Sequence, residues 1–197
     1  MLVFGMLKRT FASRSAKLWK GLYTGYIRPH LEFATQVWSP QLIGDIAALE
    51  GVQRRVTKYI AGLTRVPYTT ADADTVEKRA RLPSRLDRLE LTTLEDRRLR
   101  GDLIQQFKIA HGLDHVSVQQ QKARVGLRGA HDLCLVAPPV MSITQRQHSF
   151  ACRVVDPWNA LPQYAVTAES VIGFKNIYDG LEKGERSTSS PKPPGSS

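Results

Sequence analysis

Apolar residues recur at helical spacing through most of this chain, and this pattern restricts its fold more than any other feature of the sequence. Between residues 45 and 61, the apolar positions follow one stripe: Ile46, Leu49, Val52, Val56, Tyr59 and Ile60. Spacing of three and four residues is typical of an amphipathic helix that buries one face. The sequence therefore predicts a mainly α fold, a helical bundle-like fragment with at most one small β hairpin.

A second long helix is predicted for residues 92–111. Thr92 and Glu95 have the spacing of a capping box, in which each side chain bonds the backbone N–H of the other residue, and Gly112 suits the helix end. We expect the core face of this helix to carry Leu99, Leu103, Phe107 and Ala110. We expect its outward face to carry Arg97, Arg98, Gln105 and Lys108.

Shorter elements are predicted on either side of these two helices. Residues 13–28 form a helical pattern, and Pro29 disfavours helical geometry at Arg28, so we expect that helix to stop there and allow a new one to start. Residues 133–136 suit a short strand. Ser170 suits the cap of the last helix.

The chain's 197 residues suit one domain, or one domain with a tail. Residues 1–113 are predicted to form a basic helical region, and residues 114–126 a polar linker or loop. Residues 127–183 are predicted to form a C-terminal helical region. The remainder, residues 184–197, is rich in Ser, Pro and Gly and cannot bury much apolar area, so we expect a disordered tail.

The charge of the chain points to an anionic partner. Lys and Arg number 28 against 18 Asp and Glu, a formal net charge of +10, and nucleic acid is the usual partner of such a chain. The first acid is Glu32, and this basic, acid-free start also fits a mitochondrial presequence. A nuclear or cytoplasmic location is favoured, with a mitochondrial one as the alternative. No apolar run is long enough to span a membrane, so no membrane partner is expected, and two cysteines exclude a disulfide scaffold.

Bases on the outward helix faces are the candidate nucleic-acid-binding residues. They are Arg54, Arg55, Lys58, Arg97 and Arg98. Such side chains can follow a phosphate backbone without reading bases, although each face also fits an ordinary solvated surface. Five aromatic residues suit base stacking or a core, and the helical spacing favours the core: Trp19, Tyr23, Tyr26, Phe33 and Trp38.

Signatures of catalysis and cofactor binding are missing from the sequence. It has no phosphate-binding Gly loop, no Gly-x-Ser-x-Gly turn and no His-Glu-x-x-His helix, and no cofactor is expected. His131-x2-Cys134 and His148-x3-Cys152 have zinc-like spacing. Their order is unusual, and two ordinary thiols with two surface imidazoles is the favoured interpretation, so no metal is expected.

Several sequence pieces occur in an order that resembles a known enzyme family. They include Ile27-Arg28-Pro29-His30-Leu31, Gln36-Val37-Trp38-Ser39-Pro40, Val52-Gln53-Arg54-Arg55, Leu94-Glu95-Asp96-Arg97-Arg98-Leu99 and Trp158-Asn159-Ala160-Leu161-Pro162. This set resembles the segment that follows the polymerase core in non-LTR (LINE-type, Jockey-like) retrotransposon reverse transcriptases. The resemblance covers most of residues 7–181, with departures at Ala130 and Pro157.

The resemblance implies a part of an RNA-directed DNA polymerase that lacks the catalytic turn. The family's Tyr/Phe-x-Asp-Asp turn and its endonuclease are absent from this sequence. The chain therefore resembles the non-catalytic, thumb-proximal region beyond the palm, which is expected to hold template RNA and target DNA. The missing polymerase core would be its partner in a full-length element protein. A functionless expressed remnant is a further alternative.

Overall fold

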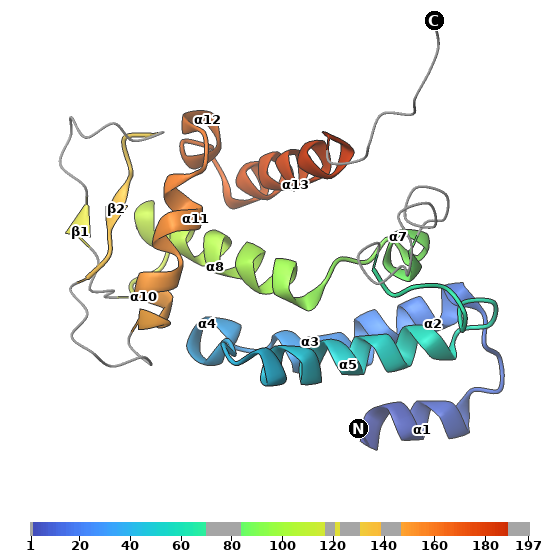
Figure 1. Ribbon diagram of the computed structural model, residues 1–197. Coiled ribbons are helices and arrows are strands. Elements are labelled where there is room, and N and C mark those ends of the chain that lie inside the picture. Colours follow the sequence, from blue (N-terminus) through green and yellow to red (C-terminus); the bar gives the residue numbers. More distant parts are fainter. Residues whose placement is uncertain (1, 70–83, 117–120, 123–130, 139–146, 189–197) are drawn as a thin grey trace, which may run out of the picture. The chain divides into compact units, whose positions relative to one another are not determined.

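A computed structural model describes residues 2–69, 84–116, 121–122, 131–138 and 147–188, and this part of the chain is mainly helical, as predicted (Figure 1). The elements up to residue 110 are α1 (Leu2–Thr10), α2 (Ala16–Leu22), the π-helical turn η1 (Tyr23–Ile27), α3 (Arg28–Glu32), α4 (Thr35–Trp38), α5 (Ile43–Tyr59), α7 (Arg85–Leu89) and α8 (Leu94–Ala110). Those that follow are β1 (Gln121–Lys122), β2 (Leu135–Val136), α10 (Phe150–Arg153), α11 (Val155–Asn159), α12 (Gln163–Val166) and α13 (Val171–Thr188). Strands β1 and β2 pair antiparallel. None of the described helices is long and apolar enough to cross a membrane.

The chain divides into two compact units, Met1–Arg98 and Leu99–Ser197. The division falls within α8, whereas the sequence placed it at the predicted linker, residues 114–126. The reason is that Leu103 and Phe107 in the later turns of α8 belong to the second unit's core. In the predicted linker, residues 117–120 and 123–126 lie outside the described residues. Helix α13 includes residues 184–188 of the predicted tail, and residues 189–197 lie outside the described part.

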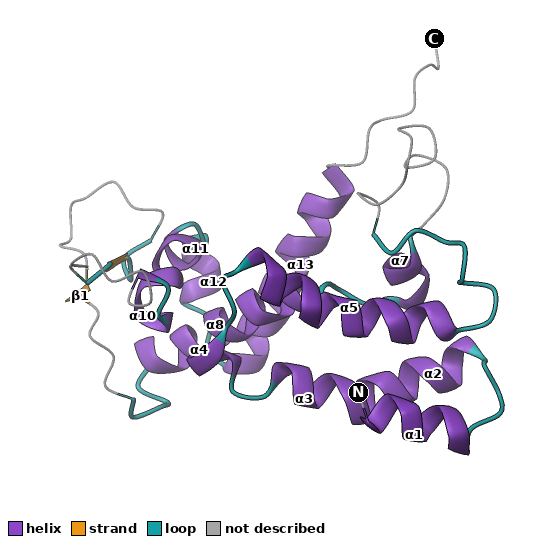
Figure 2. Cartoon of the chain, turned by 60° about the horizontal axis from the view of Figure 1, so that its bottom comes forward, coloured by secondary structure: helices purple, strands orange, loops and turns teal. Residues whose placement is uncertain are grey.

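The core of the first unit forms where α1, α2, η1 and α5 meet. Helices α2 and α3 lie beside α5 (Figures 1 and 2). Trp19 is fully buried, and its ring packs edge-on against Tyr59 at 4.7 Å and Phe4 at 5.9 Å between centroids. Tyr23 is also buried, and its hydroxyl donates to the amide oxygen of buried Gln53. The prediction that Trp19 and Tyr23 are core residues is confirmed.

The helical path continues through Arg28, where the prediction expected a stop, and the new helix that Pro29 was expected to allow is α3. Residues 23–27 form the π turn η1, in which the Arg28 N–H bonds the Tyr23 carbonyl. Arg28 itself is helical, with φ −58° and ψ −40°. Pro29 then occupies the first turn of α3, where a helix needs no amide donor. A π turn adds one residue to the helical path and so changes which carbonyl the proline ring meets.

Helix α8 begins one residue later than the predicted capping box requires. The Thr93 hydroxyl, rather than that of Thr92, accepts the Asp96 N–H at 3.1 Å. Glu50 of α5 accepts the N–H groups of Leu94 at 2.6 Å and Glu95 at 3.3 Å. A carboxylate at a helix N-terminus satisfies orphan donors and complements the helix dipole. Glu50 therefore joins α5 to the start of α8, which local sequence cannot indicate.

The core of the second unit is built around aromatic rings from α8, α11 and α13. Phe107 and Phe174 stack at 4.7 Å between centroids, and Trp158 lies 6.2 Å from Phe174. All three side chains are buried. Ser170 caps α13 by accepting the Gly173 N–H at 3.0 Å, which confirms the predicted start of the last helix.

Candidate nucleic-acid interface

The solvent-facing side of α5 carries three of the five predicted binding residues. Arg54, Arg55 and Lys58 are all exposed, whereas Gln53 and Val56 on the opposite side are buried. Residues three and four apart are neighbours on a helix surface, so Lys58 lies between the rows of Arg54 and Arg55. We call Arg54, Arg55 and Lys58 the α5 basic face.

Two further bases reach the Arg55 side of this face from other elements. The Lys8 ammonium lies 4.8 Å from the centroid of the Tyr59 ring, and the Arg14 guanidinium lies 4.2 Å from it. Arg14 also donates from two nitrogens to the Tyr59 carbonyl, at 2.8 and 2.6 Å. A cation is favourable at the C-terminal end of a helix, where carbonyl groups lack partners. The fold thus brings the basic N-terminal segment against the end of α5.

The other side of the α5 basic face is bounded by Tyr68. The Arg54 guanidinium lies 4.6 Å from the Tyr68 ring centroid, and that of Arg85 lies 5.4 Å from it. Arg85 is buried and donates to the Arg54 carbonyl at 3.1 Å. Cation–π contacts help to hold a guanidinium in place. Arg54 is therefore positioned by a ring while its side chain stays exposed.

The one acid between Ile46 and Lys58 does not offset these charges. This acid is Glu50, whose carboxylate accepts the Tyr68 hydroxyl and the backbone N–H groups at the start of α8. Burial, followed by the hydrogen bond to Glu50, raises the pKa of Tyr68 well above its usual value. Tyr68 is therefore neutral and donates its hydroxyl hydrogen to Glu50. Because Glu50 is engaged in these contacts, the exposed side of α5 carries the positive charges of the α5 basic face.

The predicted basic face of α8 does not exist as such. The guanidinium of Arg97 donates to both carboxylate oxygens of Glu32, one at 2.9 Å. Arg98 is only 5% exposed, so the prediction that it faces solvent is wrong. One of its terminal nitrogens is buried with no hydrogen-bond partner among the described residues. Of the predicted core residues of α8, Leu103 and Phe107 are buried and Ala110 packs against the same core, whereas Leu99 is 37% exposed.

Three of the predicted core aromatics are exposed instead. They are Tyr26, Phe33 and Trp38. The prediction of a core role is therefore wrong for these residues, because the turn between α3 and α4 carries Phe33 and Trp38 out of the helical stripe. Ala34 in that turn has a left-handed backbone with φ +51°, which apolar periodicity does not reveal.

The residues with zinc-like spacing are used differently in the structure. The two ring nitrogens of buried His131 contact the backbone, one 2.9 Å from the Trp158 carbonyl and the other accepting the Leu133 N–H at 3.1 Å. Both lone-pair positions that could bind a metal are thereby engaged. Cys134 and Cys152 are free, half-buried thiols, and His148 is exposed. The described residues include no group of three or more His, Cys, Asp or Glu placed to hold a metal ion.

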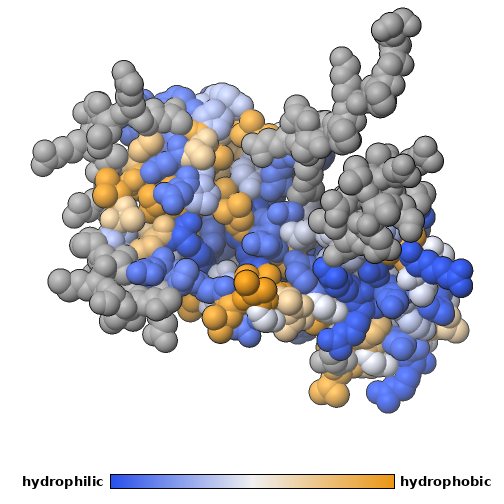
Figure 3. Space-filling model, in the orientation of Figure 1, coloured by the Kyte–Doolittle hydropathy of each residue, from blue (hydrophilic) through white to orange (hydrophobic). Residues whose placement is uncertain are grey.

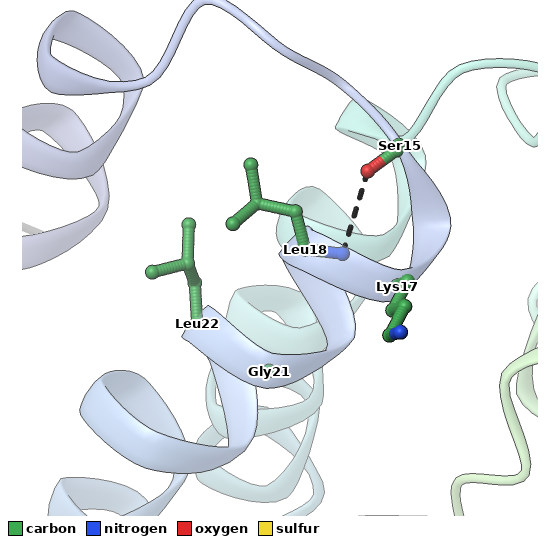
Figure 4. Close-up of a pocket in the computed structure, with 5 residues that line it drawn as sticks. All are labelled: Ser15, Lys17, Leu18, Gly21 and Leu22. Atoms are coloured by element: carbon green, nitrogen blue, oxygen red, sulfur yellow. Dashed lines mark hydrogen bonds between the residues drawn. The ribbon is translucent and has the colours of Figure 1, made fainter.

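An open pocket of about 460 Å³ lies along α2, with Ser15, Lys17, Leu18, Gly21 and Leu22 around it (Figure 4). Leu18 and Leu22 point to one side of the helix, and Lys17 points away from them. The Ser15 hydroxyl caps the helix by accepting the Leu18 N–H at 3.4 Å. Among the described residues that line this pocket, Lys17 is the only titratable one.

Comparisons of the chain with protein families, with curated proteins and with solved structures found no match. Function is therefore inferred from the residues and their geometry. Sequence reasoning found the α5 basic face but not the contribution of Lys8 and Arg14. The acid-free start was the available signal, but its contact with Tyr59 depends on tertiary packing.

Proposed function

We propose that this chain is a non-catalytic C-terminal fragment of a non-LTR retrotransposon reverse transcriptase that binds RNA or DNA through the α5 basic face. The observation that carries the proposal is the gathering of five bases from three segments around the exposed side of one helix. They are Arg54, Arg55 and Lys58 with Lys8 and Arg14. The ordered sequence pieces that resemble the post-palm region support the same conclusion.

Binding at this face is electrostatic. Lys and Arg side chains neutralise phosphates and release condensed counterions, which supplies most sequence-independent affinity. Rings hold Arg54 and Arg14 in position, so less side-chain freedom is lost when a phosphate binds. No base reading is required of these residues, because phosphate contacts position a protein without specifying sequence.

The Trp158–Pro162 piece of the resemblance supports a structural, non-catalytic interpretation of the second unit. The Trp158 indole donates to the Leu133 carbonyl at 2.9 Å. Asn159 pairs with both backbone groups of Leu135, accepting its N–H at 2.8 Å and donating to its carbonyl at 2.9 Å. These side chains hold an extended segment, as a neighbouring strand would.

Packing of the N-terminal segment favours this proposal over the mitochondrial alternative. Phe4 packs against the rings of Trp19 and Tyr59, and Leu7 is buried in the same core. Cleavage within about the first 30 residues, as in a presequence, would remove α1 and α2 from this core. Retained binding in the test below would also argue against a functionless remnant.

The proposal is tested by measuring the binding of the chain to a labelled single-stranded RNA at a series of salt concentrations. Log affinity falls linearly with log salt, and each phosphate contact should make this slope more negative by about 0.7 for a single strand. The double variant Arg55→Gln/Lys58→Gln should make that slope less negative by about 1.4. The matched control Lys175→Gln/Lys183→Gln removes the same charge from α13 and should leave the slope nearly unchanged.

Two outcomes would contradict the proposal. One is an affinity that does not depend on salt. The other is an equal loss of slope in both double variants, which would mean that net charge rather than the α5 basic face governs binding. A primer-extension assay with the same RNA and Mg²⁺ addresses the non-catalytic part, and we expect no DNA product.

A further inference from the structure

Two cations from different segments lie against the ring of Tyr59, the last residue of α5. The Lys8 ammonium of α1 lies 4.8 Å from the ring centroid, and the Arg14 guanidinium, which precedes α2, lies 4.2 Å from it. The two charges are therefore no more than about 9 Å apart, the sum of these distances. We call Lys8 and Arg14 the Tyr59 cation pair. Like charges at this separation repel each other, so an anion that contacts both is favourable.

Arg14 is held in place but keeps donors for a ligand. Its Nε and Nη2 atoms donate to the Tyr59 carbonyl at 2.8 and 2.6 Å, and its own carbonyl accepts the Ala61 N–H at 3.0 Å. A guanidinium has five N–H groups, so three remain after these two bonds. A side chain fixed in this way loses little further freedom when an anion binds. Arg14 can therefore offer two N–H groups to two oxygens of one phosphate.

Lys8 is positioned by aromatic rings rather than by a carboxylate. Its ammonium lies 5.5 Å from the Phe4 ring centroid as well as 4.8 Å from that of Tyr59. In the ion pairs that join described residues, neither Lys8 nor Arg14 takes part, and the sequence has no acid before Glu32. Both cations are exposed, and Figure 3 shows hydrophilic side chains over the end of α1. The Tyr59 cation pair therefore offers two positive charges to a single external anion.

We propose that the Tyr59 cation pair binds the terminal phosphate of a nucleic-acid strand. A terminal phosphate is a phosphomonoester, which has a charge of about −1.5 to −2 at pH 7 and three oxygens that accept hydrogen bonds. A phosphodiester within the strand carries a single negative charge. Two cations that converge on one group thus favour the end of a strand over its interior. The inference rests on the proposed function, since it names the part of the nucleic acid that these bases recognise.

The position of the Tyr59 cation pair suits a site for the end of a strand. Arg54, Arg55 and Lys58 lie along the last turns of α5, and the helix ends at Tyr59. A strand whose phosphates follow the α5 basic face towards Tyr59 brings its end to the pair. Free carbonyl groups at a helix C-terminus repel anions, but the two bonds from Arg14 cover the Tyr59 carbonyl. The end of α5 can therefore accept a phosphate.

Binding of the full chain to three internally labelled single-stranded RNAs of one sequence tests this inference. One RNA has a 5′-phosphate, one a 3′-phosphate and one a hydroxyl at both ends, so the comparison also identifies which end is bound. We expect a phosphorylated end to tighten binding about fivefold at low salt. Lys8→Gln should reduce this preference to less than about twofold. The matched control, Arg9→Gln, removes an exposed base of the same helix and should leave the preference unchanged.

Equal binding of the three RNAs, with an affinity that still falls as salt rises, would overturn this inference and leave the proposed function intact. Failure of all three RNAs to bind would overturn both. A preference that survives Lys8→Gln, or that Arg9→Gln reduces equally, would place the terminal phosphate elsewhere on the chain and so overturn the assignment to the Tyr59 cation pair. Lys8→Met keeps the apolar part of the side chain on the two rings, and it decides the matter if Lys8→Gln does not fold.

Discussion

The two units of this chain differ in how they use their charges. Residues 1–98 contain 17 of the 28 Lys and Arg and 10 of the 18 Asp and Glu, a net charge of +7. Residues 99–197 contain 11 and 8, a net charge of +3. The first unit therefore carries most of the chain's excess positive charge.

Contacts of individual side chains strengthen this contrast. In the second unit, Arg100 forms two hydrogen bonds to Asp179 at 2.6 and 2.8 Å, and Arg153 forms two to Asp102 at 2.8 and 3.0 Å. The bonds to Asp179 raise the pKa of Arg100. In the first unit, Lys8 and Arg14 lie on a tyrosine ring, which leaves their charges available to an external anion. The first unit also contains ion pairs, such as Lys20–Glu90 and Arg97–Glu32. The difference teaches that the first unit combines such pairs with exposed bases on α5, whereas Arg100 and Arg153 of the second unit are held by carboxylates.

The largest expected effect comes from Trp158→Ala in the second unit. The indole is fully buried, contacts Phe174 and bonds the Leu133 carbonyl. Removing such a ring costs about 4 kcal/mol of unfolding free energy, because a cavity and an unpaired carbonyl remain. Trp38→Ala in the first unit is the matched control, and its partly exposed ring should cost less than about 1 kcal/mol.

Urea unfolding followed by circular dichroism measures both tryptophan variants. If the two units unfold separately, Trp158→Ala should move only one of two transitions. Similar losses from the two variants would mean that burial of Trp158 does not organise the second unit as the structure indicates.

Two ion pairs, Arg153–Asp102 and Arg97–Glu32, provide the next test of the contrast between the two units. Asp102→Asn leaves Arg153 without its carboxylate in a site where the Asp102 side chain is only 6% exposed. We expect a loss of about 3 kcal/mol. Glu32→Gln removes the corresponding partner of Arg97 in the first unit, where both side chains are about one-quarter exposed, and it should cost only about 1 kcal/mol. If urea unfolding showed the same loss of unfolding free energy for both variants, the two units would not differ in how much their ion pairs contribute to stability.

Periodicity predicted the helices well but not their ends or their rotation. For α5, the predicted buried face was correct, because most positions along that face are apolar. For α8 the prediction was correct for Leu103 and Phe107 but wrong for Leu99. It also missed that Arg98, Asp102 and Gln106 are buried, because a polar residue in a helical pattern is normally assigned to solvent. Continuation of the helix through Pro29 depends on a π turn that no residue of the sequence signals.

The candidate site was predictable only in part for the same physical reason. Arg54, Arg55 and Lys58 face solvent because the opposite side of their own helix is apolar. The places of Lys8 and Arg14 beside Tyr59, and of Glu50 at the start of α8, depend on contacts 44 to 51 residues apart in sequence. Local patterns carry no information about such contacts.

A smaller effect is expected from pH, through Tyr68. Its pKa is raised in the folded state by burial and by Glu50, so above pH 10, near the usual tyrosine pKa, the unfolded chain loses a proton that the folded chain keeps. Stability should therefore fall as pH rises beyond that value. Tyr68→Phe should lower the unfolding free energy by about 1.5 kcal/mol below pH 9, because the hydrogen bond is lost. Above pH 10, the difference in unfolding free energy between variant and wild type should become smaller.

Thermal or urea unfolding from pH 7 to 11 measures this narrowing. Tyr164 of α12 is exposed, so Tyr164→Phe controls for tyrosine ionisation in general. If the difference in unfolding free energy between Tyr68→Phe and the wild type stayed constant across this range, Tyr68 would not be a buried, neutral donor. Its hydroxyl would then not be what keeps Glu50 away from the α5 basic face.

The smallest effect separates two arginines within the first unit. Arg55→Gln should make the slope of log RNA affinity against log salt less negative by about 0.7, the contribution of one phosphate contact. Arg97→Gln removes the same charge but should change the slope little, because Glu32 already holds that guanidinium. If the two variants changed the slope of log RNA affinity against log salt equally, the binding surface would extend beyond α5. Arg97 would then belong to the bases of the first unit that are available to an external anion. If only Arg55→Gln changes the slope, RNA binding depends on bases that lie on aromatic rings or face solvent. Both variants remove one arginine charge, but a carboxylate already pairs with Arg97, and no ion pair within the described part of the chain includes Arg55.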